Sequence, residues 1–395
     1  MPLNGEKSTF RLLSPTSIGQ TNRARVLELL HQEGPSSRAQ IARVLKVNRA
    51  TVATIVQPLI ENGTLVEGKS IAASKVGGKP ARPLWFNRDG LELGSMRIAP
   101  NEISAARLGI DGSIHTSRRQ ELDPDKDLNT LSGAIISMAR VCFRGRDLVG
   151  IGVAASGMVD ANTGVIISLH LAPSLNRYAV GPILAAEFQV PVIVDHHPRV
   201  QALGDKWFGH GRRVSHFASV YTGEALGFGI VHDGAIIRGD SGAGGESGHT
   251  VVDMNGAACR CGRTGCWETV ATLSWLRREA LDRNLSEAAT MDCARLTRLA
   301  EHGERAATEL LDRYAHNLAI GMANNEQILA SGTYIMHGDV CAGGPHMRAR
   351  LEHWMAMFSP SRGAPPTVIF ADTPDNMTLL GGGGLVLSTT LVTVA

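Results

Sequence analysis

This chain places four side chains of metal-binding types within eighteen residues: His249, Cys259, Cys261 and Cys266. One residue separates the first two cysteines, the third follows five positions later and the histidine lies upstream, so all four can reach one tetrahedral cation. Four protein ligands leave no position for water, whereas a catalytic zinc usually keeps one open. The pattern predicts a structural Zn2+ that shapes a loop and performs no chemistry itself.

Three of the six cysteines lie within eight residues, interleaved with Gly262 and Gly265, which permit tight turns. The alternative is that these thiols and the histidine are ordinary core residues, and their clustering favours the metal site. The other three cysteines are scattered, and we expect them to act as small apolar side chains.

Two carboxylates frame this loop, Glu246 among glycines and Glu268 directly after Trp267. Because the metal is expected to be structural, these acids are the candidates for contact with a ligand. The alternative is that Glu246 is a surface acid without a partner, and its flanking glycines favour a binding role.

The length of 395 residues, with 43% apolar and 19% charged residues, allows two or three domains and a substantial core. The amino end lacks the pattern of a signal peptide, and no run of about 18 to 20 apolar residues predicts a membrane span. Together with reduced thiols at a metal site, this predicts a cytoplasmic protein without a membrane partner.

Charge is distributed unevenly along the chain. Residues 1–85 contain 12 Lys and Arg but only 5 Glu and no Asp, whereas the whole chain has a net charge of +2. A basic module attached to an acidic body is typical of proteins that bind polyanions. The alternative is a solvated basic face with no partner.

The amino-terminal segment has the pattern of a helix-turn-helix. Apolar spacing predicts a helix over 22–33, a short helix over 38–45 with Ile41, Val44 and Leu45 inward, and a longer helix over 49–62. Ser36 and Ser37 offer an N-cap for the second helix, Asn48 caps the third, and Pro58 is expected to kink it. A strand from Leu65 and a basic segment up to Phe86 would form a wing.

Such a winged helix-turn-helix places the amino-terminal half of its third helix in the major groove of DNA. The basic segment 78–83 could lie in a minor groove. A protein-interaction module is the alternative, and the basic charge favours DNA. The residues predicted to contact DNA are Arg38, Asn48, Arg49, Ala50, Thr51, Thr54, Gln57, Lys79 and Arg82.

Beyond about residue 84 the pattern changes to short apolar strands that alternate with helices in both halves of the chain. Strands are expected at 148–155, 190–194, 217–221, 227–231, 333–336 and 367–370, and helices near 128–143, 199–208, 273–281 and 306–327. This predicts an α/β body with an internal duplication and a cleft between two lobes. The domain boundaries that follow are 15–85 for the winged helix and 86–395 for the body.

The body resembles the ROK family of repressors, open reading frames and kinases, which includes the N-acetylglucosamine and xylose repressors. The resemblance rests on Gly150-Ile151-Gly152-Val153, Gly157-Met158-Val159-Asp160, the glycine turn 223–229, the segment 244–249 and above all the cysteine loop 259–268. It covers nearly the whole chain, and it implies a duplicated actin-like (RNase H-like) fold of the ATPase type.

The resemblance also implies a sugar bound between the lobes. In the family's kinases the histidine of the zinc loop and two nearby glutamates contact sugar hydroxyls, which corresponds here to His249, Glu246 and Glu268. Carboxylates accept hydrogen bonds from hydroxyls while the metal holds the loop. His196 and His197 are further candidates, because His197 stands where the kinases have their catalytic Asp, and a histidine can also accept a proton.

The segments that would hold ATP phosphates depart from the family's pattern. Residues 97–101 lack the family's Asp and its following glycines, and Glu224 stands in a turn where an acid would repel a triphosphate. We therefore expect a repressor without enzymatic activity, in which a sugar or sugar phosphate controls the DNA affinity of a homodimer or homotetramer. The alternatives are a sugar kinase with an added DNA-binding domain, and a regulator that responds to a protein partner with the cleft empty.

Overall fold

A computed structural model describes residues 15–69, 82–87, 90–239, 244–359, 364–372 and 376–391. The chain divides into two compact units, one formed by Met1–Leu91 with Leu387–Ala395 and the other by Glu92–Val386. Lys79, one of the residues predicted to contact DNA, lies outside the described residues. None of the described helices is long and apolar enough to cross a membrane.

The described residues of the first unit up to residue 91 form three helices and a small antiparallel sheet whose strand order is β1-β3-β2. Its elements are α1 (Pro15–Glu33), β1 (Ser36–Ser37), α2 (Arg38–Val44), α3 (Arg49–Glu61), β2 (Leu65–Glu67) and β3 (Pro83–Phe86). The helices bury the apolar faces that the spacing predicts, including Leu27, Ile41 and Val56. This small core joins all three helices to the sheet through Leu65 and Leu84.

The caps that the sequence predicts are present. Ser37 accepts a hydrogen bond from the backbone of Gln40 and forms a capping box with it, and the Asn48 side chain accepts from the amide of Thr51 at 2.7 Å. Two details of the prediction are wrong. The first helix already includes Pro15, and Val44 at the end of α2 is 59% exposed, while Ala42 is buried in the core.

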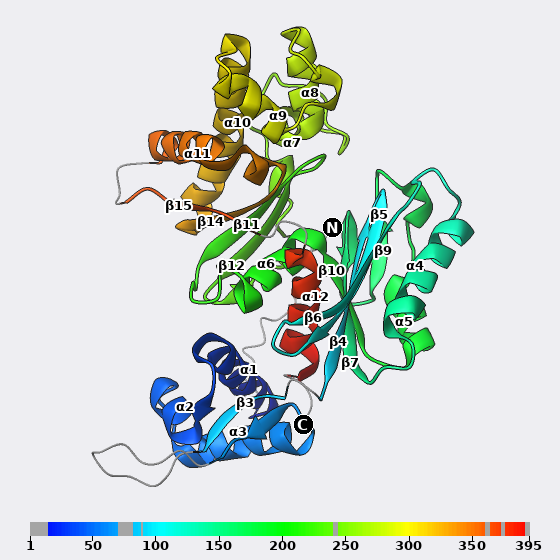
Figure 1. Cartoon of the computed structure of the whole chain (residues 1–395), viewed down its shortest axis with the longest axis vertical. Coiled ribbons are helices and arrows are strands. Elements are labelled where there is room, and N and C mark those ends of the chain that lie inside the picture. The colour runs from blue at the N-terminus through cyan, green and yellow to red at the C-terminus, as the bar shows by residue number, and fades with distance from the viewer. Residues whose placement is uncertain are drawn as a thin grey trace, which may run out of the picture. The chain divides into compact units, whose positions relative to one another are not determined.

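The second unit is built on two five-stranded sheets with the same topology (Figure 1). In each sheet a meander of three antiparallel strands is followed by two strands parallel to its first strand. The first sheet contains β4 (Glu92–Ala99), β5 (Glu102–Gly109), β6 (Ile114–Glu121), β7 (Leu148–Ala155) and β10 (Val192–His196). The second contains β11 (Phe217–Thr222), β12 (Gly227–His232), β13 (Ala235–Ile236), β14 (Thr333–Gly338) and β15 (Thr367–Phe370). This repeat confirms the predicted duplication.

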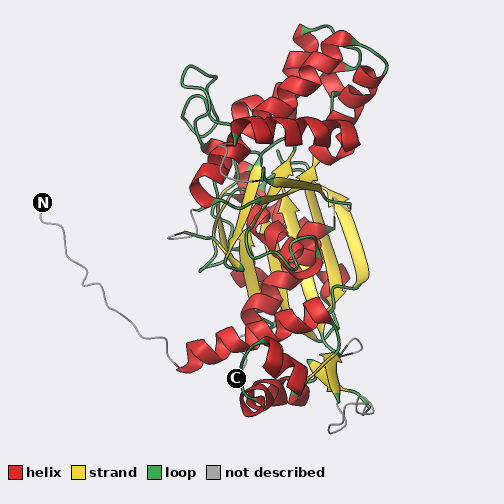
Figure 2. Cartoon of the chain, turned by 90° about the vertical axis from the view of Figure 1, so that its left-hand side faces the viewer, coloured by secondary structure: helices red, strands yellow, loops and turns green. Residues whose placement is uncertain are grey.

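Helices complete each lobe. The first lobe carries α4 (Leu128–Phe143), α5 (Val180–Phe188) and the hairpin β8 (Met158–Asp160) and β9 (Val165–Ser168). The second lobe carries α7 (Glu268–Ala271), α8 (Leu273–Asp282), α9 (Cys293–Glu301), α10 (Arg305–Leu329) and α11 (Gly344–Phe358). Figure 2 shows the strands of the two sheets in the middle of this unit, with a group of helices at its upper end.

Two helices lie between the sheets and join the lobes: α6 (His197–Phe208) and α12 (Met377–Val386). They pack against each other, and α12 covers β7 and β4 while α6 covers β11 and β12. The contact is close because α12 contains four consecutive glycines. A Cβ atom on Gly381 would lie 1.9 Å from the carbonyl oxygen of Val200, and one on Gly382 would lie 2.1 Å from the Ser95 hydroxyl. The sequence pattern did not predict α12.

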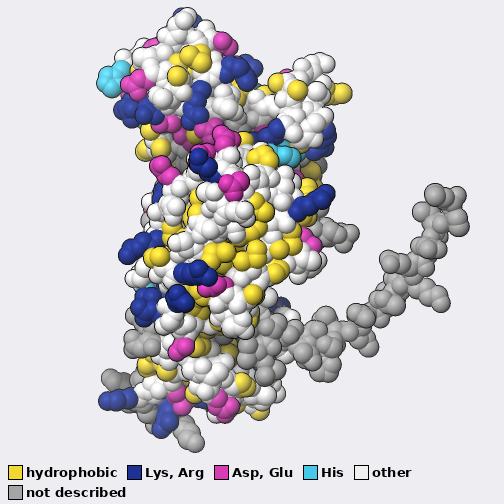
Figure 3. Space-filling view, turned by 90° about the vertical axis from the view of Figure 1, so that its right-hand side faces the viewer, with side chains coloured by type: hydrophobic (Ala, Val, Ile, Leu, Met, Phe, Trp, Pro, Cys, Tyr) yellow, Lys and Arg dark blue, Asp and Glu magenta, His cyan; other side chains and the backbone are white. Residues whose placement is uncertain are grey.

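Hydrophobic side chains gather on the face of the first lobe shown in Figure 3. Exposed large residues of this lobe include Leu128 and Val141 on α4, the latter 68% exposed, and Ile167 on β9. An apolar face of this kind is a common place for contact with another protein.

Candidate metal centre and ligand-binding site

The four predicted metal ligands converge in the structure. His249 ends a short 3-10 helix, Ser247–His249, and the three cysteines lie in the loop that precedes α7. One ligand atom from each of the four residues lies within 4.8 Å of all the others. Cys259 Sγ is 3.6 Å from His249 Nδ1, and Cys261 Sγ is 3.6 Å from Cys266 Sγ.

These spacings fit a tetrahedral cation. With bonds of about 2.3 Å to sulfur and about 2.0–2.1 Å to nitrogen, Zn2+ would separate two sulfurs by about 3.8 Å and a sulfur from a nitrogen by about 3.6 Å. Burial raises the pKa of Cys266 to about 12, whereas the backbone amide of Arg263 lowers the pKa of Cys261 to about 7. A bound cation would therefore displace a thiol proton at Cys266.

Backbone hydrogen bonds and a glycine form the turns of the cysteine loop. The amide of Cys259 donates to the carbonyl of Arg263 at 2.7 Å, and Gly265 has a positive φ of 70°. A Cβ atom at Gly265 would lie 1.7 Å from the carbonyl oxygen of Asp253, so this position requires glycine. The backbone turns and the three cysteine ligands therefore lie in the same short loop before α7.

Glu268 lies beside this centre but is already engaged. Its carboxylate is buried, accepts from the amide of Leu226 at 3.0 Å and from Arg260 Nη2 at 3.0 Å, and lies 3.9 Å from His249 Nδ1. Arg260 stands between two of the cysteines, and the sequence analysis did not assign it a role. A sugar hydroxyl at Glu268 would share this carboxylate with Arg260.

Glu246 is the more accessible of the two acids. Its side chain is 38% exposed, and its Oε1 lies 3.3 Å from His196 Nδ1. Burial and then the nearby charge of Glu268 raise the pKa of Glu246, with Arg199 opposing them. The structure therefore brings Glu246 and His196 together, and contact of either residue with a ligand stays a prediction.

Buried ion pairs hold the segment of residues 244–249, which we call the Glu246 loop. Asp195 and Arg199 are each 1% exposed, and Arg199 Nε donates to Asp195 Oδ1 at 2.7 Å. The second carboxylate oxygen accepts from Arg238 Nε at 3.0 Å. Arg199 Nη1 also donates to the carbonyl of Gly244 at 2.9 Å, which ties α6 to the start of the loop.

The loop has a second anchor on α10. The Ser247 hydroxyl donates to Asn325 Oδ1 at 2.9 Å, and both residues are buried. Because the network at Asp195 belongs to the first sheet and α10 belongs to the second lobe, the loop contacts elements of both lobes. Neither Arg199 nor Asn325 was predicted from the sequence, although Arg199 stands four residues after Asp195, the spacing of an ion pair at a helix start.

His197 faces a different environment from the other predicted ligand residues. Its ring is buried, its Nε2 lies 3.1 Å from the Thr378 hydroxyl at the start of α12, and it packs edge-on against Tyr221. Burial lowers the pKa of His197 well below its ordinary value, followed by the charge of Arg97. A direct contact between His197 and a sugar stays a prediction.

The pKa of His197 leads to a testable pH dependence. Below about pH 6.5 the unfolded chain binds a proton that the folded state refuses, so the free energy of unfolding falls as the pH falls. At pH 5.5 this costs about 1.4 kcal/mol relative to pH 7.5. Calorimetric melting at both pH values should show a smaller acid destabilisation in His197→Gln, which keeps a partner for Thr378. Equal pH dependence of the two proteins would contradict this assignment.

The two segments that correspond to the phosphate-binding segments of the family's kinases contain ion pairs. On β4, Arg97 Nη1 donates to Glu102 Oε1 at 3.0 Å, and Arg119 on β6 pairs with the other oxygen of that carboxylate. In the turn between β11 and β12, Glu224 pairs with Arg277 at 2.6 Å. Both segments thus hold charged side chains that are engaged in ion pairs.

In the first unit, the start of α3 presents the predicted DNA-contacting residues to solvent. Arg49, Ala50, Thr54 and Gln57 are exposed, and Thr51 is half-buried. Two of these side chains have local partners: the Thr54 hydroxyl donates to the carbonyl of Ala50, and Gln57 Nε2 donates to Glu61 at 2.9 Å.

Three other predicted DNA contacts are engaged within the unit. Asn48 uses its side-chain oxygen to cap α3. Arg38 pairs with Glu67 on β2, and Arg82 lies 3.7 Å from the same carboxylate. Arg82 remains 64% exposed, so it is the freer of the two arginines.

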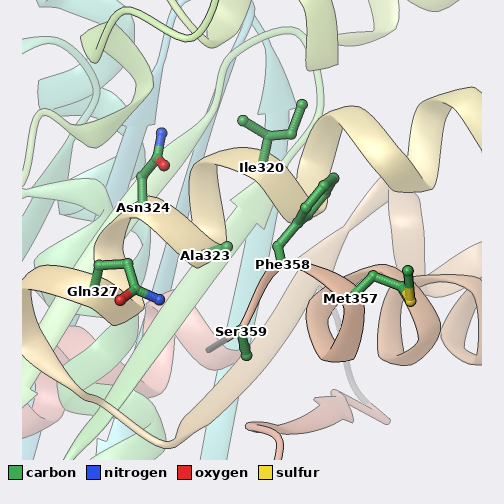
Figure 4. A pocket seen from close by; sticks show the side chains of 7 residues that line it. All are labelled: Ile320, Ala323, Asn324, Gln327, Met357, Phe358 and Ser359. Atoms are coloured by element: carbon green, nitrogen blue, oxygen red, sulfur yellow. The ribbon is translucent and has the colours of Figure 1, made fainter. Parts of the chain in front are cut away.

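A separate groove lies between α10 and α11, with a volume of about 560 Å3 (Figure 4). Ile320, Ala323, Asn324 and Gln327 of α10 line it together with Met357, Phe358 and Ser359 at the end of α11. None of the residues predicted to bind metal, ligand or DNA belongs to this lining.

A duplicated two-lobed α/β unit with a Cys3His loop beside paired carboxylates defines the class of protein. Residues 94–388 match the model of the ROK family, and the chain belongs to that family. The xylose repressor of Caldicellulosiruptor bescii is 28% identical over 326 residues, which cover 78% of this chain and 80% of the repressor. The DNA-binding transcriptional dual regulator NagC of Escherichia coli is 28% identical over 336 residues, covering 80% and 81%.

A solved structure has the same fold over almost the whole chain. It is the crystal structure of a ROK family transcriptional regulator, a homolog of the E. coli MLC protein, and it superposes with a TM-score of 0.78 at 23% identity. The match covers 95% of this chain and 97% of that one. The two-lobed actin-like α/β fold expected from the resemblance is therefore confirmed.

Proposed function

We propose that this protein is a DNA-binding transcriptional repressor whose affinity for its operator is changed by a sugar or sugar phosphate bound between the lobes. One observation supports this above all: the segment that contains Glu246 is held by the buried Arg199 and ends at His249, a member of the Cys3His cluster. The ion pairs of Arg97 and Glu224 are further support, because they stand in the segments where the family's kinases hold phosphate. The relatives named as a repressor and a DNA-binding regulator support the same function.

The amino-terminal unit is proposed to be a winged helix-turn-helix over residues 15–85, followed by the effector-binding body over 86–395. This assignment is supported by the two helices α2 and α3, which are joined by a turn over residues 45–48. Strands β2 and β3 would form the wing. The basic charge of this segment suits the phosphate backbone of DNA.

Arg49→Ala is expected to weaken operator binding by about 10- to 100-fold, the loss of about 1–3 kcal/mol for one base contact. Arg49 is exposed at the first position of α3, where side chains meet base edges. Fluorescence anisotropy at one fixed salt concentration measures the effect. Arg305→Ala, which removes an equally cationic and exposed side chain from α10, is the control. Equal affinities of the two variants would refute a role for α3 in recognition.

The metal is proposed to be one structural Zn2+ held by His249, Cys259, Cys261 and Cys266. A zinc ion on Nδ1 of His249 would fix the ring and leave Nε2 to hydrogen-bond a ligand. Vicinal hydroxyls of a sugar would donate to Glu246 and Glu268, with His196 and His197 as further contacts.

Glu246→Gln is expected to lower sugar affinity by at least about tenfold, because a charge-assisted hydrogen bond becomes a neutral one. Zinc content and melting temperature should stay unchanged, since Glu246 is partly exposed and is not a metal ligand. Calorimetric titration with hexoses, amino sugars and their 6-phosphates measures the affinity. Glu352→Gln, which changes an acid of similar exposure (44%) on α11, is a matched control. Unchanged affinity for every sugar bound by the wild type would remove Glu246 from the site.

We propose that the protein does not transfer phosphate from ATP, because Glu224 and the Arg97–Glu102 pair occupy the required segments. The alternative is a sugar kinase with an added DNA-binding unit. Incubation with ATP and a hexose panel separates the two, and turnover that disappears in His197→Ala would favour the kinase. If no sugar binds at all, a regulator that responds to a protein partner would be favoured instead.

A homodimer or homotetramer is proposed as the working form, because two-fold symmetry would match a palindromic operator. The exposed apolar side chains of Ile328 (78%) and Met357 (65%) on α10 and α11 are of the kind that subunit contacts bury. Light scattering on the intact chain measures the oligomeric state.

A further inference from the structure

A second group of metal-binding side chains lies outside the Cys3His loop. His216, His232 and Asp233 bring one ligand atom each within 4.8 Å of one another. Their side chains are 41%, 48% and 82% exposed. This group lies where β11 begins and β12 ends, whereas the Cys3His loop lies before α7. Neither the family resemblance nor the proposed repressor function uses it.

The strand register places the two histidines side by side. Phe217 pairs with Val231 in the antiparallel ladder, so His216 and His232, one position further out, stand opposite each other on one face. Their Nδ1 atoms are 3.2 Å apart and their ring centroids 4.6 Å. The pairing of β11 with β12 therefore sets the spacing of the two histidine rings.

A tight turn adds the carboxylate. Asp233 and Gly234 link β12 to β13 with positive φ values of 50° and 71°, as in a two-residue hairpin turn of type I′. The amide of Gly234 donates to the carbonyl of Ser215 at 2.9 Å, and the Lys206 amine donates to the Gly234 carbonyl. Asp233 Oδ1 then lies 3.4 Å from His216 Nε2, and its Oδ2 lies 3.9 Å from His232 Nε2.

We infer that His216, His232 and Asp233 form a second metal site, specific for borderline divalent transition ions such as Zn2+, Ni2+ or Cu2+. Two imidazoles and one carboxylate suit these ions, whereas Mg2+ and Ca2+ prefer oxygen ligands alone. One cation binds one nitrogen of each ring. Bonds of about 2.1 Å at right angles separate neighbouring ligand atoms by about 3.0 Å, close to the 3.2 Å between the two Nδ1 atoms. The exposed Asp233 side chain, which faces the Nε2 atoms, would turn to complete the site. The remaining positions on the ion would hold water or a ligand from another molecule.

The test titrates NiCl2 into zinc-loaded, full-length protein at pH 7.5 by calorimetry, with zinc content measured afterwards. We expect one Ni2+ per chain and no loss of zinc. His216→Gln and Asp233→Asn should each weaken the binding of Ni2+ at least about tenfold. Asn tolerates the left-handed conformation of position 233, so this variant keeps the turn. His353→Gln, which removes an exposed histidine from α11, is the matched control and should bind Ni2+ like the wild type.

Two results would overturn the inference. One is that the zinc-loaded wild type takes up no Ni2+. The other is uptake that is the same in the wild type, His216→Gln and Asp233→Asn, which would place the ion elsewhere. Electron paramagnetic resonance of the Cu2+ complex adds a direct readout: coupling to two nitrogens supports the site, and its persistence in His216→Gln contradicts it.

Discussion

Replacing Cys266 with serine is expected to remove the zinc and abolish control of DNA binding by the sugar. Cys266 is fully buried and its sulfur lies 3.6 Å from that of Cys261, and a serine hydroxyl does not supply the thiolate that a Cys3His zinc site needs. Structural zinc stabilises small folded peptides by about 10–16 kcal/mol, and here part of that energy holds the loop next to Glu246 and Glu268. We expect sugar affinity to fall at least about 100-fold.

Elemental analysis of the purified chain should give one zinc in the wild type and almost none in Cys266→Ser. Calorimetry and operator binding then measure the sugar response of both proteins. Cys341→Ser is the control, because this thiol lies outside the loop and donates to the carbonyl of Met336, which a hydroxyl can also do. An effector response that persists after metal removal would mean that the loop does not depend on zinc to bind the sugar.

The second large effect is expected from Asp195→Ala. This change leaves Arg199, which is 1% exposed, without the carboxylate that accepts its Nε hydrogen bond. Removing one partner of a buried ion pair costs about 3–5 kcal/mol, because the remaining charge stays out of water. Sugar affinity should fall as well, since Arg199 also holds the carbonyl of Gly244 at the start of the Glu246 loop.

Calorimetric melting of the full chain measures the stability change, and the transition to follow is that of the second unit. Arg140→Ala is the matched control, because its two hydrogen bonds to Glu187, of 2.7 and 2.8 Å, join an arginine that is 50% exposed. Exposed pairs contribute only about 0–1 kcal/mol. If both variants lost the same stability, the buried ion pairs of Asp195 would contribute no more to stability than an exposed pair.

Local features of this protein could be predicted from its sequence. The metal ligands lie within eighteen residues, so short-range turns alone bring them together. Ser37 and Asn48 cap α2 and α3 because a cap needs only its own first turn. Helix α4 has the predicted bounds, Leu128–Phe143, since its apolar spacing and Asp127 cap are both local.

Features that depend on a partner far along the chain could not be predicted. A run of four glycines disfavours a helix by propensity, yet α12 forms there because only glycine lets its backbone approach Val200 and Ser95. Val44 has the spacing of a core residue but is exposed, since burial depends on which elements pack against a helix and not on spacing alone. The partner of Glu268, Arg260, depends on how the cysteine loop folds back over α7.

By itself, the sequence determined the chemistry that was available: a Cys3His set, two framing acids, a basic amino-terminal segment, a segment 97–101 without glycine and an acid in the turn at Glu224. The tertiary structure decided which groups meet. It placed Arg199 and Arg238 on Asp195 under the Glu246 loop, set His197 against Thr378 of α12 and brought His216 opposite His232. The reason is physical, because ligand type and turn preference are properties of a few neighbouring residues, whereas burial and ion pairing depend on strand register and helix packing across the whole chain.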